Sequence, residues 1–447
     1  MKASSPSEKA WRWRVFLITW LVYAAYYFCR KNFSVEMPLL EHEFGYSNLQ
    51  LATVVFGYSL FYALGQFCSG ILSDHFGPRK VVGIGMLIVA LANFAMGFQM
   101  SLVGFGLLGC LNGVAQSTGW PGLVKNMASW FKREERGVVM GWWGTNYALG
   151  GFAATIFVTF VVTQLKLFSH WGWRRGFWLP AAVVVVVAIA YITLVRDRPS
   201  DVGLPDVDED APLVQSGAQP KGDGEAGGAP QGTLTVFRKL ISEKTIWIVS
   251  GTFFLLKMTR YGFLFWLPVY MTQQLHYSVK DAGYTSSLYE LVGFSGALIA
   301  GYASDRLFHS RRPPVIALML WGLALACLVQ PVLSGYGRWG NIVGVCLIGI
   351  MTFGPDTLIS GATAQDLGST QGAATAAGFI DGVGSLGQLG SPFVVALISA
   401  RYGWNALFYT FVLLAAAAGV LMATRWKYLP AATNQAVADA MELERSV

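Results

Sequence analysis

Charged residues are scarce in this sequence. Asp, Glu, Lys and Arg make up 13% of its 447 residues, and hydrophobic residues make up 54%. A soluble protein carries about 25% charged residues, so this composition excludes an ordinary soluble domain. The net charge of +7 does not indicate a nucleic-acid partner, because the basic residues are spread over short loops and form no single patch.

Cysteine is also rare, and its spacing is not that of a metal or redox site. The five cysteines all fall within apolar segments, and none forms a CxxC pair. We therefore expect them to pack between helices, with no disulfide and no metal ligand among them. The sequence has no nucleophile–base set, phosphate-binding loop or metal-ligand spacing, which argues against an enzyme and against a metal or cofactor.

What the sequence does contain is a series of apolar segments long enough to cross ~30 Å of hydrocarbon. The polar and basic residues 1–14 precede the first segment without a cleavage-site pattern, so we predict a retained span and not a signal peptide. Twelve spans are predicted, at roughly 15–40, 49–73, 81–99, 102–128, 137–165, 175–195, 246–272, 282–304, 314–334, 340–364, 371–399 and 404–424.

The spans fall into two sets of six. Residues 197–240 between them are rich in Gly, Pro, Ser, Gln, Ala and acidic residues, which is typical of a flexible hydrophilic linker. We predict an all-α membrane protein with an N-terminal six-helix half at 1–196, a cytoplasmic linker at 197–240 and a C-terminal six-helix half at 241–447.

The distribution of lysine and arginine predicts the orientation. Of 32 such residues, 21 lie in the segments on the side of the two termini and 6 lie in the loops on the opposite side. Because cytoplasmic segments carry the excess of positive residues, both termini are predicted to be cytoplasmic. The short loops and the lack of disulfides favour a bacterial inner membrane, with an internal eukaryotic membrane as the alternative.

Two arginines lie where charge is costly. Arg30 falls inside the first predicted span and Arg260 inside the seventh. A charged residue at bilayer depth usually faces a bundle interior or a water-filled cavity and has a function. With one arginine in each half, the pair is predicted to converge on one anionic substrate.

The two halves also repeat a loop sequence. Gly-Ile-Leu-Ser-Asp-His-Phe-Gly-Pro-Arg-Lys (70–80) follows the second span, and Gly-Tyr-Ala-Ser-Asp-Arg (301–306) follows the eighth. Parallel repeats with a binding site between them are typical of alternating-access transporters.

The 70–80 segment resembles the loop motif of the major facilitator superfamily, with a histidine at position 75 in place of the usual arginine. In that family the aspartate contacts a facing helix end and pairs with arginine, which latches the cytoplasmic gate. The resemblance therefore implies a gating role for Asp74 and Arg79, and the repeat extends it to Asp305 and Arg306.

Within the superfamily, the chain resembles the organophosphate:phosphate antiporters through all twelve spans. The most specific segments are Tyr-Ala-Ala-Tyr-Tyr-Phe-Cys-Arg-Lys-Asn-Phe-Ser (23–34), Gly-Trp-Pro (119–121), Trp-Phe-Lys-Arg-Glu-Glu-Arg-Gly (130–137), Arg-Tyr-Gly-Phe-Leu-Phe-Trp (260–266), Phe-Gly-Pro (353–355) and Ala-Ala-Thr-Ala-Ala-Gly-Phe (373–379). Arg30 and Arg260 fall on the family's two phosphate-binding arginines. The resemblance implies a monomeric carrier that exchanges an organic phosphate ester for inorganic phosphate.

Further residues are candidates for the substrate site. Lys31 and Glu290 resemble a family ion pair across the halves, which is either a switch that phosphate breaks or a static bridge. Lys257 lies one turn before Arg260 and either adds positive field or pairs with an aspartate. Asp356 and Asp381 are expected to bind sugar hydroxyls, bind a cationic group, pair with Lys257, or make structural hydrogen bonds.

The organic part of the substrate is less defined. The family's glycerol-phosphate carriers have a histidine in the fifth span, and alignment on Gly150 and Gly151 puts Tyr147 there, next to Asn146. Both can hydrogen-bond a substrate, but the change puts glycerol 3-phosphate in doubt. Aromatic residues that either form site walls or pack in the core are Tyr27, Trp120 and Tyr261.

Two other functions compete with phosphate antiport. A related hexose-phosphate sensor implies that this fold can serve as a membrane receptor that binds a sugar phosphate and signals through a partner kinase. A carrier for another organic anion, such as a carboxylate or phosphonate, is the second alternative.

Overall fold

The computed structural model describes residues 6–131, 139–140, 142–206, 241–308 and 311–428. Every regular element within these ranges is helical, and they contain no strand. The predicted all-α fold class is therefore confirmed. The described helices account for the twelve predicted spans in two halves of six.

The N-terminal half contains two spans that are each divided between two helices. Span 1 consists of α1 (Pro6–Tyr26) and α2 (Phe28–Phe44), and span 4 consists of α5 (Leu102–Gln116) and α6 (Gly119–Trp130). The remaining spans of this half are α3 (Asn48–Phe76), α4 (Pro78–Met96), α8 (Asn146–Thr163) and α9 (Arg175–Leu194). A 3₁₀ turn, η1 (Ser169–Arg174), precedes α9.

The interruption of span 1 lies directly before its buried arginine. The backbone N–H of Tyr27 donates to the carbonyl of Ala24 at 3.1 Å, and the N–H of Arg30 donates to the carbonyl of Tyr27 at 3.1 Å. These three-residue bonds tighten the helix locally. The side chains of α2 are therefore rotated relative to those of a regular continuation of α1.

The C-terminal half runs from α11 (Lys244–Gln273) to α15. Its other elements are α12 (Val279–Tyr302), η3 (Ala303–Leu307), α13 (Arg312–Gly335), α14 (Gly337–Thr357), η4 (Leu358–Thr363) and α15 (Ala364–Ala423). The last two predicted spans both lie in α15, which reverses direction at Gly403. The φ of Gly403 is +80°, a conformation that glycine adopts without steric cost.

Six of the described segments are long and apolar enough to cross a membrane on length and composition alone. They are Pro78–Met96, Asn146–Thr163, Ser169–Leu194, Arg312–Gly335, Gly337–Gly361 and Ala376–Ala423. The helices that carry Arg30 and Arg260 are not among them. Their span assignment therefore depends on the fold and not on hydropathy.

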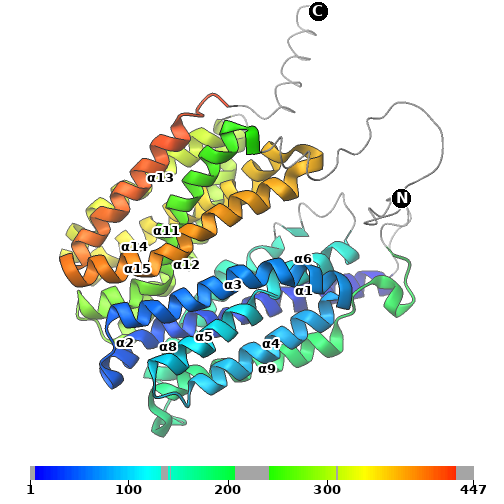
Figure 1. Cartoon of the computed structure of the whole chain (residues 1–447), viewed down its shortest axis with the longest axis horizontal. Coiled ribbons are helices and arrows are strands. Elements are labelled where there is room, and N and C mark those ends of the chain that lie inside the picture. The colour runs from blue at the N-terminus through cyan, green and yellow to red at the C-terminus, as the bar shows by residue number, and fades with distance from the viewer. Residues whose placement is uncertain (1–5, 132–138, 141, 207–240, 309–310, 429–447) are drawn as a thin grey trace, which may run out of the picture.

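The two halves form two bundles that lie side by side (Figure 1). They contact each other through α12 with α8, α15 with α3, and α11 with α2. We call the side on which α1 begins, α9 ends and α11 begins the linker side. The opposite side, where α2 ends and α3 begins, is the far side.

The start of the predicted linker is ordered against the N-terminal half. Nδ2 of Asn126 donates to the carbonyl of Arg196 at 3.1 Å, and the indole N–H of Trp130 donates to the same carbonyl at 3.0 Å. A 3₁₀ turn, η2 (Pro199–Val202), follows. Residues 207–240 lie outside the described residues, so the linker boundaries stay a prediction.

Glycine allows α12 and α14 to approach closely. A Cβ added at Gly296 would overlap the backbone carbonyl of Ile350, whereas nothing lies within 4 Å of a Cβ added at Gly301 on the same helix. Small residues at such contacts are typical of membrane helices, which associate through close packing. The register of α12 on α14 thus depends on Gly296.

We predict that Gly296→Ala destabilises the protein by about 1–3 kcal/mol, because the methyl group forces α12 and α14 apart. Gly301→Ala is the matched control and should be neutral or slightly stabilising, since alanine favours helix by up to ~1 kcal/mol over glycine. Thermal unfolding in detergent, followed by tryptophan fluorescence, measures both. Equal unfolding temperatures for the two variants would contradict the packing argument.

Candidate functional site

Arg30 is buried without a carboxylate partner. It is 8% exposed, and its Nε donates to Oε1 of Gln116 at 2.8 Å. The same oxygen accepts from the hydroxyl of Tyr58 at 3.0 Å. The guanidinium lies over the rings of Tyr27 and Tyr62, 4.8 and 4.9 Å from their centroids. Among the residues that the structure describes, no carboxylate pairs with Arg30, so an amide and aromatic faces hold its charge.

Arg260 on α11 has a different environment. Its Nη1 lies 2.6 Å from Oδ1 of Asp356 on α14, in a buried ion pair. The guanidinium also lies 5.0 Å from the ring centroid of Phe353 and 5.7 Å from that of Tyr147. Tyr147 and Phe353 are stacked with an interplanar angle of 2°, and they come from opposite halves. Sequence reasoning did not anticipate the pairing of Arg260 with Asp356.

The two arginines lie beside tyrosines of two helices that contact each other. The guanidinium of Arg30 lies 4.8 Å from the ring centroid of Tyr27 on α2, and that of Arg260 lies 5.9 Å from the ring centroid of Tyr261 on α11. α2 and α11 belong to opposite halves and pack against each other. Binding of one anion by both arginines stays a prediction.

Lys31 connects α2 to the other half. Its Nζ donates to the carbonyl of Leu264 at 2.6 Å and lies 3.7 Å from Oε1 of Glu290 on α12. The hydroxyl of Ser34, one turn on, donates to the carbonyl of Phe265 at 2.6 Å. Both Lys31 and Glu290 are buried, so the pair lies in a region of low dielectric. A switching role for the pair stays a prediction.

Lys257 and Asp381 form a second pair within the C-terminal half. Nζ of Lys257 lies 2.7 Å from Oδ1 of Asp381 on α15, and the side chain of Asp381 is 48% exposed. Of the roles considered for these residues, pairing between Lys257 and Asp381 is present. Asp356 pairs with Arg260 and not with Lys257. Arg260 lies one turn after Lys257 on α11, and the side chain of Asp356 on α14 reaches α11 at this later turn.

The remaining predicted site residues are less closely connected to the arginines. Asn146 is fully buried, and neither its amide oxygen nor its amide nitrogen has a partner. Trp120 stacks edge-on with Tyr23 at 5.0 Å and lies 5.3 Å from Trp143. Trp120 thus belongs to an aromatic cluster of the N-terminal half.

At the first gating loop, the side chain of Asp74 lies outside the described residues. The guanidinium Nε of Arg79 donates to the carbonyl of Ile192 at 2.7 Å, and the backbone N–H of Arg79 donates to Oδ1 of Asp197 at 2.7 Å. Burial raises the pKa of the Asp197 carboxyl, and this hydrogen bond opposes the increase. Asp197, which sequence reasoning assigned only to the linker, thus caps the start of α4.

At the second gating loop, the partner of Asp305 is Arg312. Arg312 forms an ion pair with Asp305, donates to the hydroxyl of Ser304 at 2.8 Å, and lies 3.5 Å from Oδ2 of Asp366. Arg306, the predicted gating arginine, is exposed. The π-helical turn η3 places Asp305 toward the start of α13, which the sequence repeat alone did not indicate.

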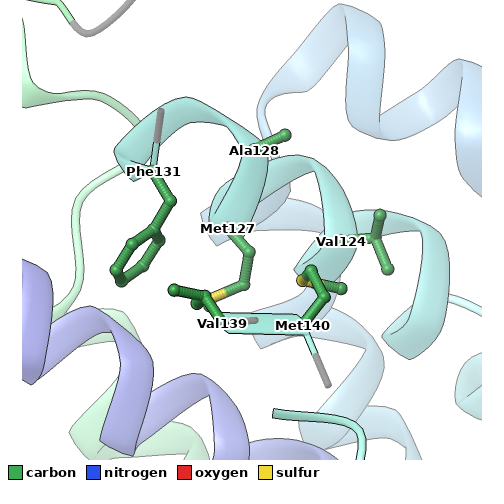
Figure 2. A pocket seen from close by; sticks show the side chains of 6 residues that line it. All are labelled: Val124, Met127, Ala128, Phe131, Val139 and Met140. Carbon is green, nitrogen blue, oxygen red and sulfur yellow. The ribbon is translucent and has the colours of Figure 1, made fainter. Parts of the chain in front are cut away.

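A cavity in the N-terminal half does not match an anion site. It has a volume of about 80 Å³ and lies beside α6 on the linker side. Figure 2 shows that its lining is entirely apolar, from Val124, Met127, Ala128, Phe131, Val139 and Met140. A cavity without a donor or a charge cannot compensate a phosphate for its lost hydration.

Sequence reasoning missed two polar residues near Arg30. Gln116 on α5 holds the guanidinium of Arg30, as described above. Glu36 on α2 is fully buried, with no partner for either carboxylate oxygen. Its position inside the first predicted span was itself a signal, because a carboxylate at that depth is as unusual as an arginine.

The halves are joined on the far side by a hydrogen-bond network around Gln273. Its Nε2 donates to Oε2 of Glu41 at 2.7 Å and to Oδ1 of Asn48 at 3.0 Å. Its Oε1 accepts from the indole of Trp404 at 3.2 Å. Glu41 and Asn48 belong to the N-terminal half, so this network closes the far side over the arginines.

The family can now be assigned. A sequence profile of the Major Facilitator Superfamily matches residues 19–392. The chain therefore belongs to the major facilitator superfamily, which consists of membrane transporters and not of enzymes. It is a multi-pass integral membrane protein.

Relatives with named activities extend over nearly the whole chain. A "Probable hexose phosphate transport protein" from Chlamydia pneumoniae is 28% identical over 94% of this chain and 92% of its own length. A "Glycerol-3-phosphate transporter" from Bacillus subtilis (strain 168) is 30% identical over 94% and 93%. A "Membrane sensor protein UhpC" from Escherichia coli (strain K12) is 30% identical over 92% and 90%. The predicted resemblance to the organophosphate group of the superfamily is confirmed.

A solved structure agrees with the fold. It is described as a bacterial homolog to human lysosomal transporter, Spinster, in inward-facing and unoccupied conformation, with a TM-score of 0.72. The match covers 95% of this chain and 96% of the other chain at 14% identity. At this identity the likeness concerns the fold alone.

We predict that Gln273→Ala weakens closure of the far side, because it removes the hydrogen bonds from both halves at once. Gln274→Ala, an exposed neighbour, is the control. Spin labels at Glu43→Cys and Lys280→Cys, which are exposed on the far side of opposite halves, report their separation in a background without the native cysteines. We expect a broader and longer distance distribution for Gln273→Ala, and an unchanged distribution would contradict this role.

Proposed function

We propose that this protein exchanges an organic phosphate ester for inorganic phosphate by alternating access, with the phosphoryl group held between Arg30 and Arg260. The observation that carries the proposal is that Arg30 and Arg260 lie on α2 and α11, two helices of opposite halves that contact each other, with Tyr27 and Tyr261 beside them. The names of the relatives support an organophosphate as the substrate.

Arginine is suited to this task. Its planar guanidinium donates paired hydrogen bonds to phosphate oxygens and stays charged at any working pH. Inorganic phosphate presents the same group without an organic part, so one site can accept either ligand. If the two halves change between their two orientations only when an anion neutralises both arginines, the protein can move one anion only in exchange for another.

The partners of the two arginines differ, which suggests an order of binding. Arg30 has no carboxylate partner in the described residues, whereas Arg260 pairs with Asp356 at 2.6 Å. Phosphate would therefore meet Arg30 first. Drawing Arg260 onto the same phosphate requires it to leave Asp356, because both anions compete for one guanidinium. In this mechanism Asp356 occupies Arg260 until substrate arrives.

The Lys31–Glu290 pair lies next to this event. It joins α2 to α12 across the halves at 3.7 Å. A phosphate at Arg30 would lie beside Lys31 and compete with Glu290 for its ammonium group. We propose that this competition loosens the far side as the linker side closes, with a static bridge as the alternative.

The organic part of the substrate would extend from the arginines toward the aromatic residues. Tyr147 stacks on Phe353 from the other half and faces Arg260. Together with Asn146, whose amide has no partner, it offers hydrogen bonds to hydroxyl groups. A sugar phosphate or a glycerol-phosphate-like ester fits this chemistry. Both termini are proposed to be cytoplasmic, in a bacterial inner membrane.

The test is exchange in liposomes loaded with unlabelled phosphate. Wild-type protein should take up labelled phosphate only when phosphate is inside. Arg30→Lys and Arg260→Lys should each lower exchange by at least ~10-fold, because lysine cannot make the paired hydrogen bonds. Arg401→Lys, at an exposed arginine, is the control. Competition by a panel of phosphate esters identifies the organic substrate, and full exchange by both arginine variants would overturn the mechanism.

We further predict that Asp356→Asn lowers the half-saturating phosphate concentration by about tenfold, equivalent to ~1.4 kcal/mol. The reason is that the variant no longer presents a competing anion to Arg260. Asp281→Asn, which removes a carboxylate paired with Arg338 on the surface, is the control. A weaker apparent affinity for Asp356→Asn would mean that Asp356 supports Arg260 instead of competing with the substrate.

A second function is favoured by the similarity to the membrane sensor from Escherichia coli. A sensor would bind a sugar phosphate at the same arginines and pass the signal to a partner protein. Binding of a phosphate ester without exchange, by folded protein in the liposomes above, would support this function over transport.

A further inference from the structure

Glu36 is a buried carboxylate with no partner. It lies on α2, in the same helix as Arg30, and is 0% exposed. Neither Oε1 nor Oε2 accepts a hydrogen bond. The other buried glutamate of the described spans, Glu290, differs because Lys31 lies 3.7 Å from it. Glu36 has no role in the exchange mechanism proposed above.

The carboxyl of Glu36 is packed tightly against the start of α9. A Cβ added at Gly176 would overlap Oε1 of Glu36, so the glycine provides the space that the carboxyl fills. Arg175 is the charged group that faces Glu36 from α9. Its two Nη atoms instead donate to the carbonyls of Leu165 and Val162, at the end of α8.

The other elements around Glu36 present no titratable group to it within the described residues. α8 contributes the apolar side chain of Val162, which approaches the same space over Gly176. α4 contributes Asn93, which is neutral and bonded to Asn32. Among the described residues, the charge of an ionised Glu36 would therefore be opposed only by Arg175, whose two Nη atoms donate to backbone carbonyls and whose Nε has no hydrogen-bond partner.

A small cavity lies beside Arg30 and Asn32, and Glu36 is not among the residues that line it. Asn32 lies one turn before Glu36 on the same face of α2, and its Nδ2 donates to Oδ1 of Asn93 at 3.0 Å. Its Oδ1 has no partner, and neither does Nη2 of Arg30. A cavity of about 20 Å³ is lined by Arg30, Asn32, Asn93 and Asn112 among others. One water molecule needs ~10–15 Å³, so the cavity has room for one between these groups.

Physical chemistry favours a neutral carboxyl at this position. An ionised carboxylate without a donor is among the most costly groups to bury, and such a group takes up a proton instead. A hydronium ion that reaches Glu36 would transfer a proton to one of its carboxylate oxygens and leave as water. The reverse transfer, from the carboxyl to water, would restore the carboxylate.

We propose that Glu36 is a proton-binding site at the contact of α2 with the start of α9, occupied in this conformation. Phosphate transport by this chain is then linked to proton uptake and release. The link to transport rests on the proposed function, whereas the proton on Glu36 does not.

Infrared spectroscopy of the protein in lipid tests the proton directly and needs no substrate. A protonated carboxyl has a C=O stretch separate from that of a carboxylate. We expect a band of this kind in wild-type protein at neutral pH, its loss in Glu36→Gln, and its retention in Glu43→Gln, which alters an exposed glutamate of the same helix. Glu36→Met is a second variant in case glutamine folds poorly. A band that persists in folded Glu36→Gln and Glu36→Met overturns the proposal.

The link to transport is tested by phosphate exchange as a function of pH in sodium-free buffer. The ionisation of phosphate affects every variant equally, so the difference between variants reports on the protein. We expect exchange by wild type and by Glu43→Gln to fall more steeply with rising pH than exchange by Glu36→Gln. The additional loss is at most about tenfold per pH unit, because a single proton is involved. Identical profiles would remove the link to transport and leave Glu36 as a static neutral acid. Stimulation by sodium that depends on Glu36 would replace the proton with a sodium ion.

Discussion

The cost of burying charge within a membrane governs this structure. The spans of the two halves carry buried cations at Arg30, Lys31 and Lys257 and a partly buried one at Arg260, and each is compensated locally. Arg260 and Lys257 have aspartates, Lys31 has a glutamate and a carbonyl, and Arg30 has an amide and aromatic rings. Because no bulk water compensates these groups, each must exchange one partner for another whenever the halves move.

The compensation is unequal, and the inequality gives the site a direction. The N-terminal half holds Arg30 with neutral groups, whereas the C-terminal half holds both of its cations with carboxylates. In the proposed mechanism, an arriving anion meets Arg30 without a competing carboxylate and displaces Asp356 from Arg260. The hydrogen bonds of Gln273 with Glu41 and Asn48 join the halves on the far side.

Much of the site was predictable because charge inside an apolar span is rare. That rule identified Arg30 and Arg260 and flagged Lys257, Asp356 and Asp381 as unusual. The same rule applies to Glu36, which was not among the predicted site residues. Gln116 and Asp197 carried no such signal, since a glutamine in a span and an aspartate in a loop are common. The pairing of Asp305 with Arg312 could not be predicted either, because the π-helical turn η3 sets the direction of the Asp305 side chain.

The sequence by itself indicated the membrane class, the two sets of apolar segments and the two arginines, because hydropathy and isolated charges are local properties, whereas the spans that carry the arginines are supported by the fold. The tertiary structure decided the pairings: Arg260 with Asp356, Arg79 with the end of α9, Asp305 with Arg312, and Glu36 with no partner at all. Each pairing depends on how helices distant in sequence are rotated and spaced against one another. That rotation is fixed by close contacts, such as the contact of Gly296 in α12 with Ile350 in α14 and the contact of Gly176 with the carboxyl of Glu36. Only the packed bundle defines these contacts.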